Sequence, residues 1–175
     1  MHGALSDDRS PTPAAQGASR ATVFHYLLAA SGAFLVGAIA WAAWRGGSPA
    51  IDASDAQLVA AGRQVYGQYC ASCHGEHLEG QPAWRERGAN GRLPAPPHDA
   101  SGHTWHHPDA VLIEIVSAGL ETGRYAQPGY RSDMPGFATM LSEQQIRASL
   151  AYIKSRWPEG LRQHQAQLTR EAAAR

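Results

Sequence analysis

The stretch CASCH, residues 70–74, constrains this chain more than any other feature because it contains both cysteines. Cys70 and Cys73 are the only two cysteines among 175 residues, and His74 follows the second one directly. Two thiols separated by two residues are typical of three kinds of site: a redox disulfide, part of a zinc site, or a covalent attachment point for haem. The sequence on either side of the motif helps to distinguish these three.

The residues before CASCH indicate a helix. A thioredoxin-like redox pair would instead follow a strand. Apolar side chains recur here at helical spacing, at Leu58, Ala61, Val65 and Tyr69. Ser54 followed by Gln57 has the spacing of a capping box, which predicts the start of this helix. The motif therefore ends a helix, and this context argues against a redox disulfide.

Zinc and haem place different demands on the motif. A zinc site needs four ligands, and no second cysteine pair is present, although the histidines of HTWHH at 103–107 keep zinc open as an alternative. A haem site uses all three residues, because each thiol forms a thioether with a porphyrin vinyl group and the histidine binds the iron. We therefore predict one covalently attached haem c at Cys70, Cys73 and His74, matured outside the cytoplasm.

A long apolar run precedes the motif. No residue from Ala21 to Trp44 carries a formal charge, and Arg20 and Arg45 bracket the run. As a helix it would be about 36 Å long, enough to cross the ~30 Å hydrocarbon layer of a membrane. We expect a retained transmembrane anchor, and a cleaved secretory signal is the alternative. Both would export the rest of the chain.

These observations predict an all-α protein with one small helical haem domain and a single N-terminal transmembrane helix. We expect it in the cytoplasmic membrane, with the haem domain facing the periplasm or cell exterior. The expected segments are a flexible tail at 1–20, the anchor at 21–45, a linker at 46–53, the haem domain at 54–158, and a solvated tail or short frayed helix at 159–175.

The haem iron needs a second axial ligand, or its far side stays open. Apart from the start residue, the methionines are Met134 and Met140. Pro135 stiffens the loop that carries Met134, whereas Met140 stands beside a helix start, where a core role is more natural. We expect Met134 to be the axial ligand; the alternative is that it fills the core.

Two further helices are readable after the motif. The first is HPDAVLIEIVSAG, with Pro108 in its first turn and Gly119 at its end. The second is LSEQQIRASLAYIKSRWP, which begins with a capping-box pair at Ser142 and Gln145 and is stopped by Pro158.

This order of elements resembles the class I cytochrome c family, in its membrane-anchored bacterial mono-haem form. The resemblance covers about residues 54–158 and rests on CASCH, a proline-containing loop, MPGF and a final helix with LAYIK. It implies thioether links at Cys70 and Cys73 and axial ligation of iron by His74 and Met134. It also implies that the first and last helices of the domain cross at Gly62 and Tyr152, where a small residue lets the backbones approach closely.

The family also has a proline carbonyl that accepts a hydrogen bond from the proximal imidazole. The matching residue here is Pro96, with Pro97 as the neighbouring choice. Residues 76–107 depart from the family pattern, because this loop is long and carries five histidines: His77, His98, His103, His106 and His107. A second metal site, such as copper, and a rival axial ligand are two interpretations. We adopt the third, a packed loop in which Trp105 donates its indole N–H to a haem propionate.

The resulting expectation is a one-electron carrier rather than an enzyme, serving membrane redox complexes or soluble carriers. One alternative is a haem subunit of a larger membrane oxidase or dehydrogenase, and another is a ligand-binding or peroxidatic protein with an open distal face. Fifteen basic residues balance fifteen acidic ones, so the composition gives no sign of a nucleic-acid partner.

Overall fold

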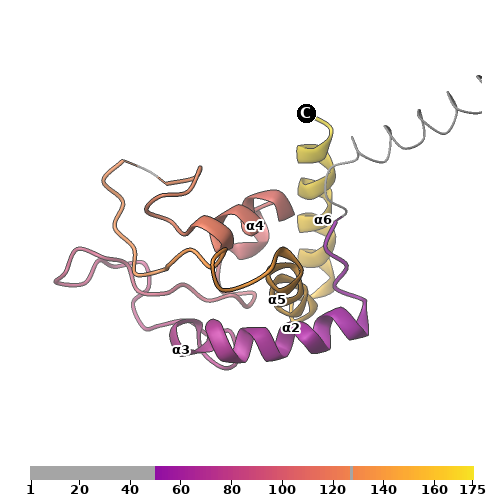
Figure 1. The fold of residues 1–175 in the computed structure, drawn as a ribbon, viewed down its shortest axis with the longest axis horizontal. Coiled ribbons are helices and arrows are strands. Elements are labelled where there is room, and N and C mark those ends of the chain that lie inside the picture. The colour runs from indigo at the N-terminus through magenta and orange to yellow at the C-terminus, as the bar shows by residue number, and fades with distance from the viewer. Residues whose placement is uncertain (1–49, 127) are drawn as a thin grey trace, which may run out of the picture. The chain divides into compact units, whose positions relative to one another are not determined.

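The computed structural model describes residues 50–126 and 128–175, and this part of the chain is built from helices (Figure 1). The predicted tail, the anchor and residues 46–49 of the linker lie outside the described residues. The elements are α2 (Ala56–Tyr69), α3 (Ala71–His74), η1 (Thr104–His106), α4 (Asp109–Ala118), α5 (Glu143–Ser155) and α6 (Glu159–Ala173). No strand occurs in the described ranges, which confirms the predicted all-helical domain. None of the helices described is both long and apolar enough to span a membrane.

The helix α2 begins one residue later than the capping-box spacing predicted. Asp55, not Ser54, is the N-cap, and its carboxylate accepts hydrogen bonds from the backbone N–H groups of Gln57 at 2.9 Å and Leu58 at 3.1 Å. The Ser54 hydroxyl donates instead to Asp52, 2.6 Å away. The prediction failed because an aspartate caps a helix as well as a serine does.

The later helix boundaries agree with the sequence prediction. Ser142 accepts a hydrogen bond from the backbone of Gln145, and the Gln145 side chain bonds back, so the predicted capping box of α5 is confirmed. Gly119 follows the last residue of α4, as predicted, whereas Pro108, expected in the first turn, is the N-cap that precedes the first residue. Pro158 lies beyond the end of α5 and becomes the N-cap of α6.

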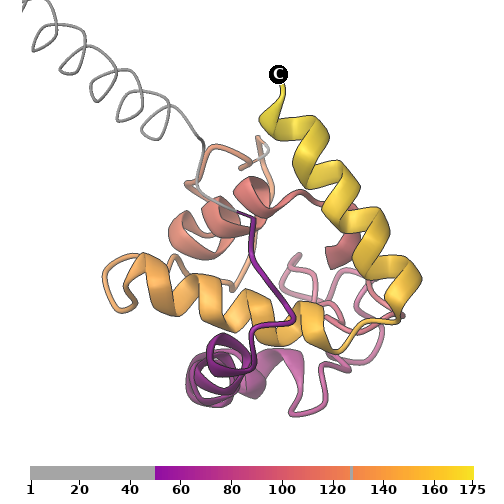
Figure 2. The ribbon, with the colours of Figure 1, turned by 90° about the vertical axis from the view of Figure 1, so that its right-hand side faces the viewer.

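The helices α2 and α5 cross at a steep angle, since α5 is seen end-on where α2 runs lengthwise in Figure 1 and the reverse holds in Figure 2. Gly62 makes the crossing possible: a Cβ atom there would overlap the carbonyl oxygen of Ala148 and lie 3.1 Å from the Cβ of Tyr152. The ring of Tyr152 also packs on that of Tyr66, with centroids 5.3 Å apart. The predicted close approach at Gly62 and Tyr152 is therefore observed.

The apolar core lies around this crossing and extends beneath the loops. Its buried side chains are Ile51, Val65, Tyr66, Leu78, Leu112, Phe137, Leu141, Ile146, Leu150, Ala151, Ile153 and Trp157. Burial of these side chains holds the loops against the helices.

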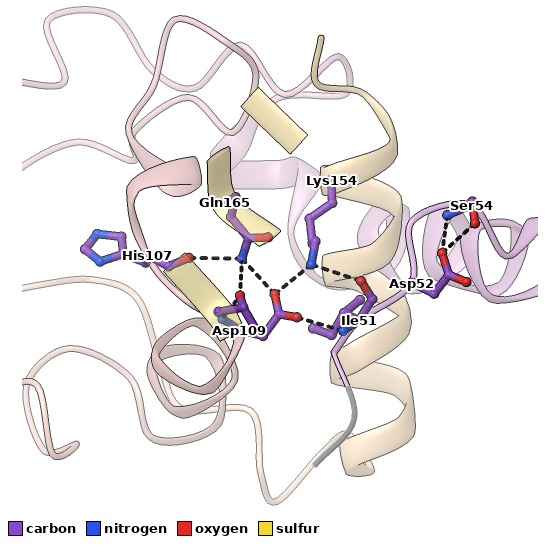
Figure 3. Close-up of polar contacts among 8 residues, drawn as sticks. Ile51, Asp52, Ser54, His107, Asp109, Lys154 and Gln165 are labelled. Atoms are coloured by element: carbon purple, nitrogen blue, oxygen red, sulfur yellow. Dashed lines mark hydrogen bonds and ion pairs between the residues drawn. The ribbon is translucent and has the colours of Figure 1, made fainter. Parts of the chain in front are cut away.

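The C-terminal segment differs from the expected tail or short frayed helix. It forms α6, a helix of 15 residues. Gln165 in α6 is completely buried, and its Nε2 donates to Asp109 Oδ1 at 2.8 Å and to the carbonyl of His107 at 3.1 Å (Figure 3). The prediction missed this contact because a buried amide contributes to it, and an apolar pattern does not reveal a buried amide.

A buried ion pair joins this amide to the beginning of the described chain. Lys154 of α5 lies with its Nζ 2.7 Å from Asp109 Oδ1, and both side chains are about 5 % exposed. The backbone of Ile51 bonds to both: its N–H donates to Asp109 Oδ2 at 2.7 Å, and its carbonyl accepts from Lys154 at 3.0 Å (Figure 3). Each charged group of the pair thus has at least one further hydrogen-bond partner, which offsets part of the cost of burying the charge.

Candidate functional site

The CASCH stretch forms a tight helical turn at the end of α2. Cys70 closes α2 and also caps α3, and its carbonyl accepts hydrogen bonds from the N–H groups of Cys73 at 3.1 Å and His74 at 2.9 Å. Gly75 ends the turn with a φ of 82°, a conformation that favours glycine. Both cysteines are free thiols, Cys70 half-buried and Cys73 exposed. One short turn therefore presents the two thiols and the imidazole together.

The environment of Cys70 argues against a redox pair. Burial, reinforced by the neighbouring Cys73, raises the pKa of the Cys70 thiol to about 11. Reactive cysteines need a lowered pKa, because the thiolate is the nucleophile. Cys70 instead packs against the apolar core, as a half-buried attachment residue would.

His74 is buried, and its ring is held by a single carbonyl. Nδ1 lies 2.9 Å from the carbonyl oxygen of Pro96, the residue that the family resemblance pairs with it. A carbonyl can only accept, so Nδ1 carries the hydrogen and Nε2 keeps its lone pair. Burial lowers the pKa of His74, and the bond to Pro96 partly offsets this. The result is a neutral imidazole with Nε2 suited to bind a metal.

The loop of Met134 packs against the end of α4. Met134 is partly buried, and its N–H donates to the hydroxyl of Ser132 at 3.0 Å. A Cβ atom on Gly119 would lie 3.0 Å from the Met134 carbonyl oxygen, so only a residue without a side chain fits this position closely. Met140 is 52 % exposed, and the expected core role for Met140 is wrong: Phe137 fills the core at that turn.

Arg92 ties the long loop to the Met134 loop, a link that sequence reasoning missed. Its NH1 donates to the Ser132 carbonyl at 2.6 Å and to Asp133 Oδ1 at 2.7 Å. Glu121 also holds the Met134 loop, because its carboxylate accepts a hydrogen bond from the backbone N–H of Ser132 at 2.8 Å. The partners are too far apart in the chain for any local pattern to reveal them.

Trp105, on η1, has a donor without an acceptor. Its indole Nε1 is buried and lacks a hydrogen-bond partner among the described residues, while its ring stacks on His106 with centroids 3.7 Å apart. A buried unpaired N–H costs free energy, roughly 1–3 kcal/mol. An anionic acceptor such as a haem propionate would remove that cost. The free thiols, the available Nε2 of His74 and this unpaired donor together fit a covalently bound haem.

His103 and His107, two of the other loop histidines, make ring contacts. His103 stacks on Trp84 with centroids 5.4 Å apart, and it meets His107 edge-on at 5.7 Å. Partial burial of the rings lowers the pKa values of His98, His103 and His107 below the ordinary value of histidine, most strongly for His98. In the described ranges no three histidine, cysteine or acidic side chains gather as a metal site would require.

An all-helical domain whose first helix ends in a Cys-x-x-Cys-His turn defines the class of covalent haem proteins that transfer electrons. The family model for cytochrome c matches residues 59–157, more than half of the chain. The chain belongs to the cytochrome c family. Family membership implies covalently attached haem c and haem-based electron transfer. No curated protein and no solved structure gives a significant match to the chain.

Proposed function

We propose that this protein is a membrane-anchored bacterial mono-haem cytochrome c of class I that carries single electrons between redox partners at the outer face of the cytoplasmic membrane. Its axial ligands are His74 and Met134. The observation that carries the proposal is the 2.9 Å contact between His74 Nδ1 and the Pro96 carbonyl, one turn from two free thiols. When bound, the haem supplies a one-electron iron couple.

The protein's own residues hold and orient the group. Cys70 and Cys73 would hold the group through thioethers, and Pro96 keeps the hydrogen on Nδ1 of His74 so that Nε2 would be free to bind the iron. Trp105 would donate its indole N–H to a propionate. Met134 would supply the second ligand from its loop, which Arg92 fastens to the rest of the domain. With both ligands supplied by the protein, little would need to move when the charge on the iron changes.

The anchoring part of the proposal rests on the uncharged run within residues 21–45. A single span there would place the haem domain on the periplasmic or outer side. Partners would then be membrane redox complexes or soluble carriers, met through small transient contacts. Tethering to the same membrane raises the effective concentration of a membrane partner without any new contact.

The ligand test is an optical spectrum of the full chain, produced in a host that matures c-type haem. The oxidised protein should show the weak far-red band that reports sulfur bound to ferric iron. Met134→Ala should abolish the band, and Met140→Ala, which removes an exposed methionine, should keep it. Loss of the band in the Met140 variant alone would overturn the assignment of Met134, and absence of covalent haem would overturn the proposed function.

The anchor is tested by membrane fractionation. The full chain should remain with the membrane after a high-salt wash, and a chain that starts at residue 46 behind a cleavable export signal should be released as a soluble haem protein. Release of both forms would contradict a retained anchor.

A further inference from the structure

His98 packs directly on the face of His74. The two imidazole rings are stacked, with centroids 3.9 Å apart and planes inclined by only 20°. Sequence reasoning counted His98 among five loop histidines and gave it no individual role. The stacking contact sets it apart from the other four, because it alone touches the ring that binds the iron in the proposed function.

His98 is itself held on several sides. Its ring Nδ1 lies 2.8 Å from the hydroxyl of Thr104, which is buried. The backbone N–H of His98 donates to the carbonyl of Leu78 at 2.8 Å, and the backbone carbonyl of His98 accepts from the indole N–H of Trp157 at 2.7 Å. A side chain fixed in this way at backbone and ring presents a rigid flat surface.

The bond to Pro96 alone does not define the plane of the His74 ring. The ring turns about its Cβ–Cγ bond, which carries Nδ1 along an arc, so the hydrogen bond to Pro96 limits this turn only within the tolerance of its length and angle. A second ring in van der Waals contact with its face blocks that turn. Pro96 and His98 therefore supply complementary restraints, one in the plane of the imidazole and one perpendicular to it.

We propose that His98, fixed by Thr104, is a positioning residue that sets the ring plane of His74 and thereby the orientation of the axial imidazole on the haem. This inference rests on the proposed ligation of iron by His74. The plane of an axial imidazole determines how the ferric d orbitals split and how unpaired spin spreads over the porphyrin. A change in the plane of the His74 ring should therefore be visible in the spectra of the ferric protein rather than in its stability.

The test compares the oxidised holoprotein with its variants by electron paramagnetic resonance and by the paramagnetic shifts of the haem methyl protons. His98→Ala should change both the g values and the pattern of methyl shifts. His98→Phe restores a flat ring and should return both toward the wild-type pattern. Thr104→Val should broaden the signals, because the stacked ring loses its hydrogen bond. His77→Ala, an exposed histidine of the same loop, is the matched control and should change nothing.

The outcomes separate this inference from the proposed function. A wild-type protein without histidine-ligated covalent haem would overturn the proposed function. Intact ligation with the same g values and methyl shifts in His98→Ala as in wild type would overturn the positioning role alone. If His98→Ala fails to incorporate haem, Thr104→Val decides: an unchanged spectrum in that variant also overturns the role of His98.

Discussion

Gly62 of α2 lies so close to Ala148 of α5 that any Cβ atom at position 62 would overlap the Ala148 carbonyl oxygen. The overlap involves backbone, which cannot move aside as the end of a flexible side chain can. Gly62→Ala should therefore force the two helices apart and lower the free energy of unfolding by about 1–3 kcal/mol or more. Denaturant titration followed by circular dichroism measures this.

Gly67 offers a matched control on the same helix. A Cβ atom there meets nothing within 4 Å, and the residue is exposed. Gly67→Ala should leave stability unchanged or raise it by up to about 1 kcal/mol, because alanine is the better helix former. Equal destabilisation by both substitutions would contradict a crossing controlled by Gly62.

Lys154→Met should leave the carboxylate of Asp109 buried without its cation. Breaking a buried pair from one side costs about 3–5 kcal/mol, since the remaining charge is uncompensated. Thermal unfolding of the two proteins measures the loss. Glu143→Gln removes an ion pair on the same helix in which the glutamate side chain is 64 % exposed and the partner Arg147 is partly buried, and it should cost less than about 1 kcal/mol. Similar losses in both variants would mean that the Lys154 pair is not desolvated.

Arg92→Gln should loosen the loop of Met134 without unfolding the domain. Because the partner carboxylate of Asp133 is 70 % exposed, solvent screens its ion pair with Arg92, and we expect a loss of only about 1 kcal/mol in methionine ligation. A titration with imidazole, monitored through the loss of the far-red band, should then show that the variant binds imidazole roughly fivefold more tightly than wild type. Arg63→Gln, on the exposed side of α2, should bind imidazole like wild type. Unchanged imidazole binding in Arg92→Gln would mean that the contacts of Arg92 do not help to hold Met134 on the iron.

Trp105→Phe distinguishes a haem partner from an unpaired indole. If the buried N–H donates to a propionate in the holoprotein, its removal should destabilise that form by about 1–2 kcal/mol. If the indole stays unpaired, removing a buried unsatisfied donor should be neutral or stabilising. The sign of the change in melting temperature of the holoprotein separates these outcomes. Trp84→Phe, on the same loop, serves as the control for loss of an indole.

Local patterns were enough to predict the parts of the fold that local physics decides. The capping box at Ser142, the limits of α4 and the helical turn of CASCH all follow from residues a few positions apart. The contact between His74 and Pro96 agrees with the family resemblance, which pairs the same two residues. The start of α2 was misplaced by one residue because Ser54 and Asp55 compete for the same cap.

Contacts between distant polar residues escaped prediction. Gln165 looks like a surface residue in the sequence, and only its partner Asp109, 56 positions away, makes its burial favourable. Arg92 and Asp133 are separated by 41 positions, so neither indicates the other. The exposure of Met140 was missed for a related reason: periodicity does not reveal that Phe137 has already filled the core beside it.

The two hydrogen bonds of the Ile51 backbone have a consequence for the mechanical behaviour of the domain. Its N–H is bound to Asp109 at the start of α4, and its carbonyl is bound to Lys154 near the end of α5. A force applied to the chain before Ile51 would therefore load two buried hydrogen bonds at once, and it would reach α2 only after both had broken.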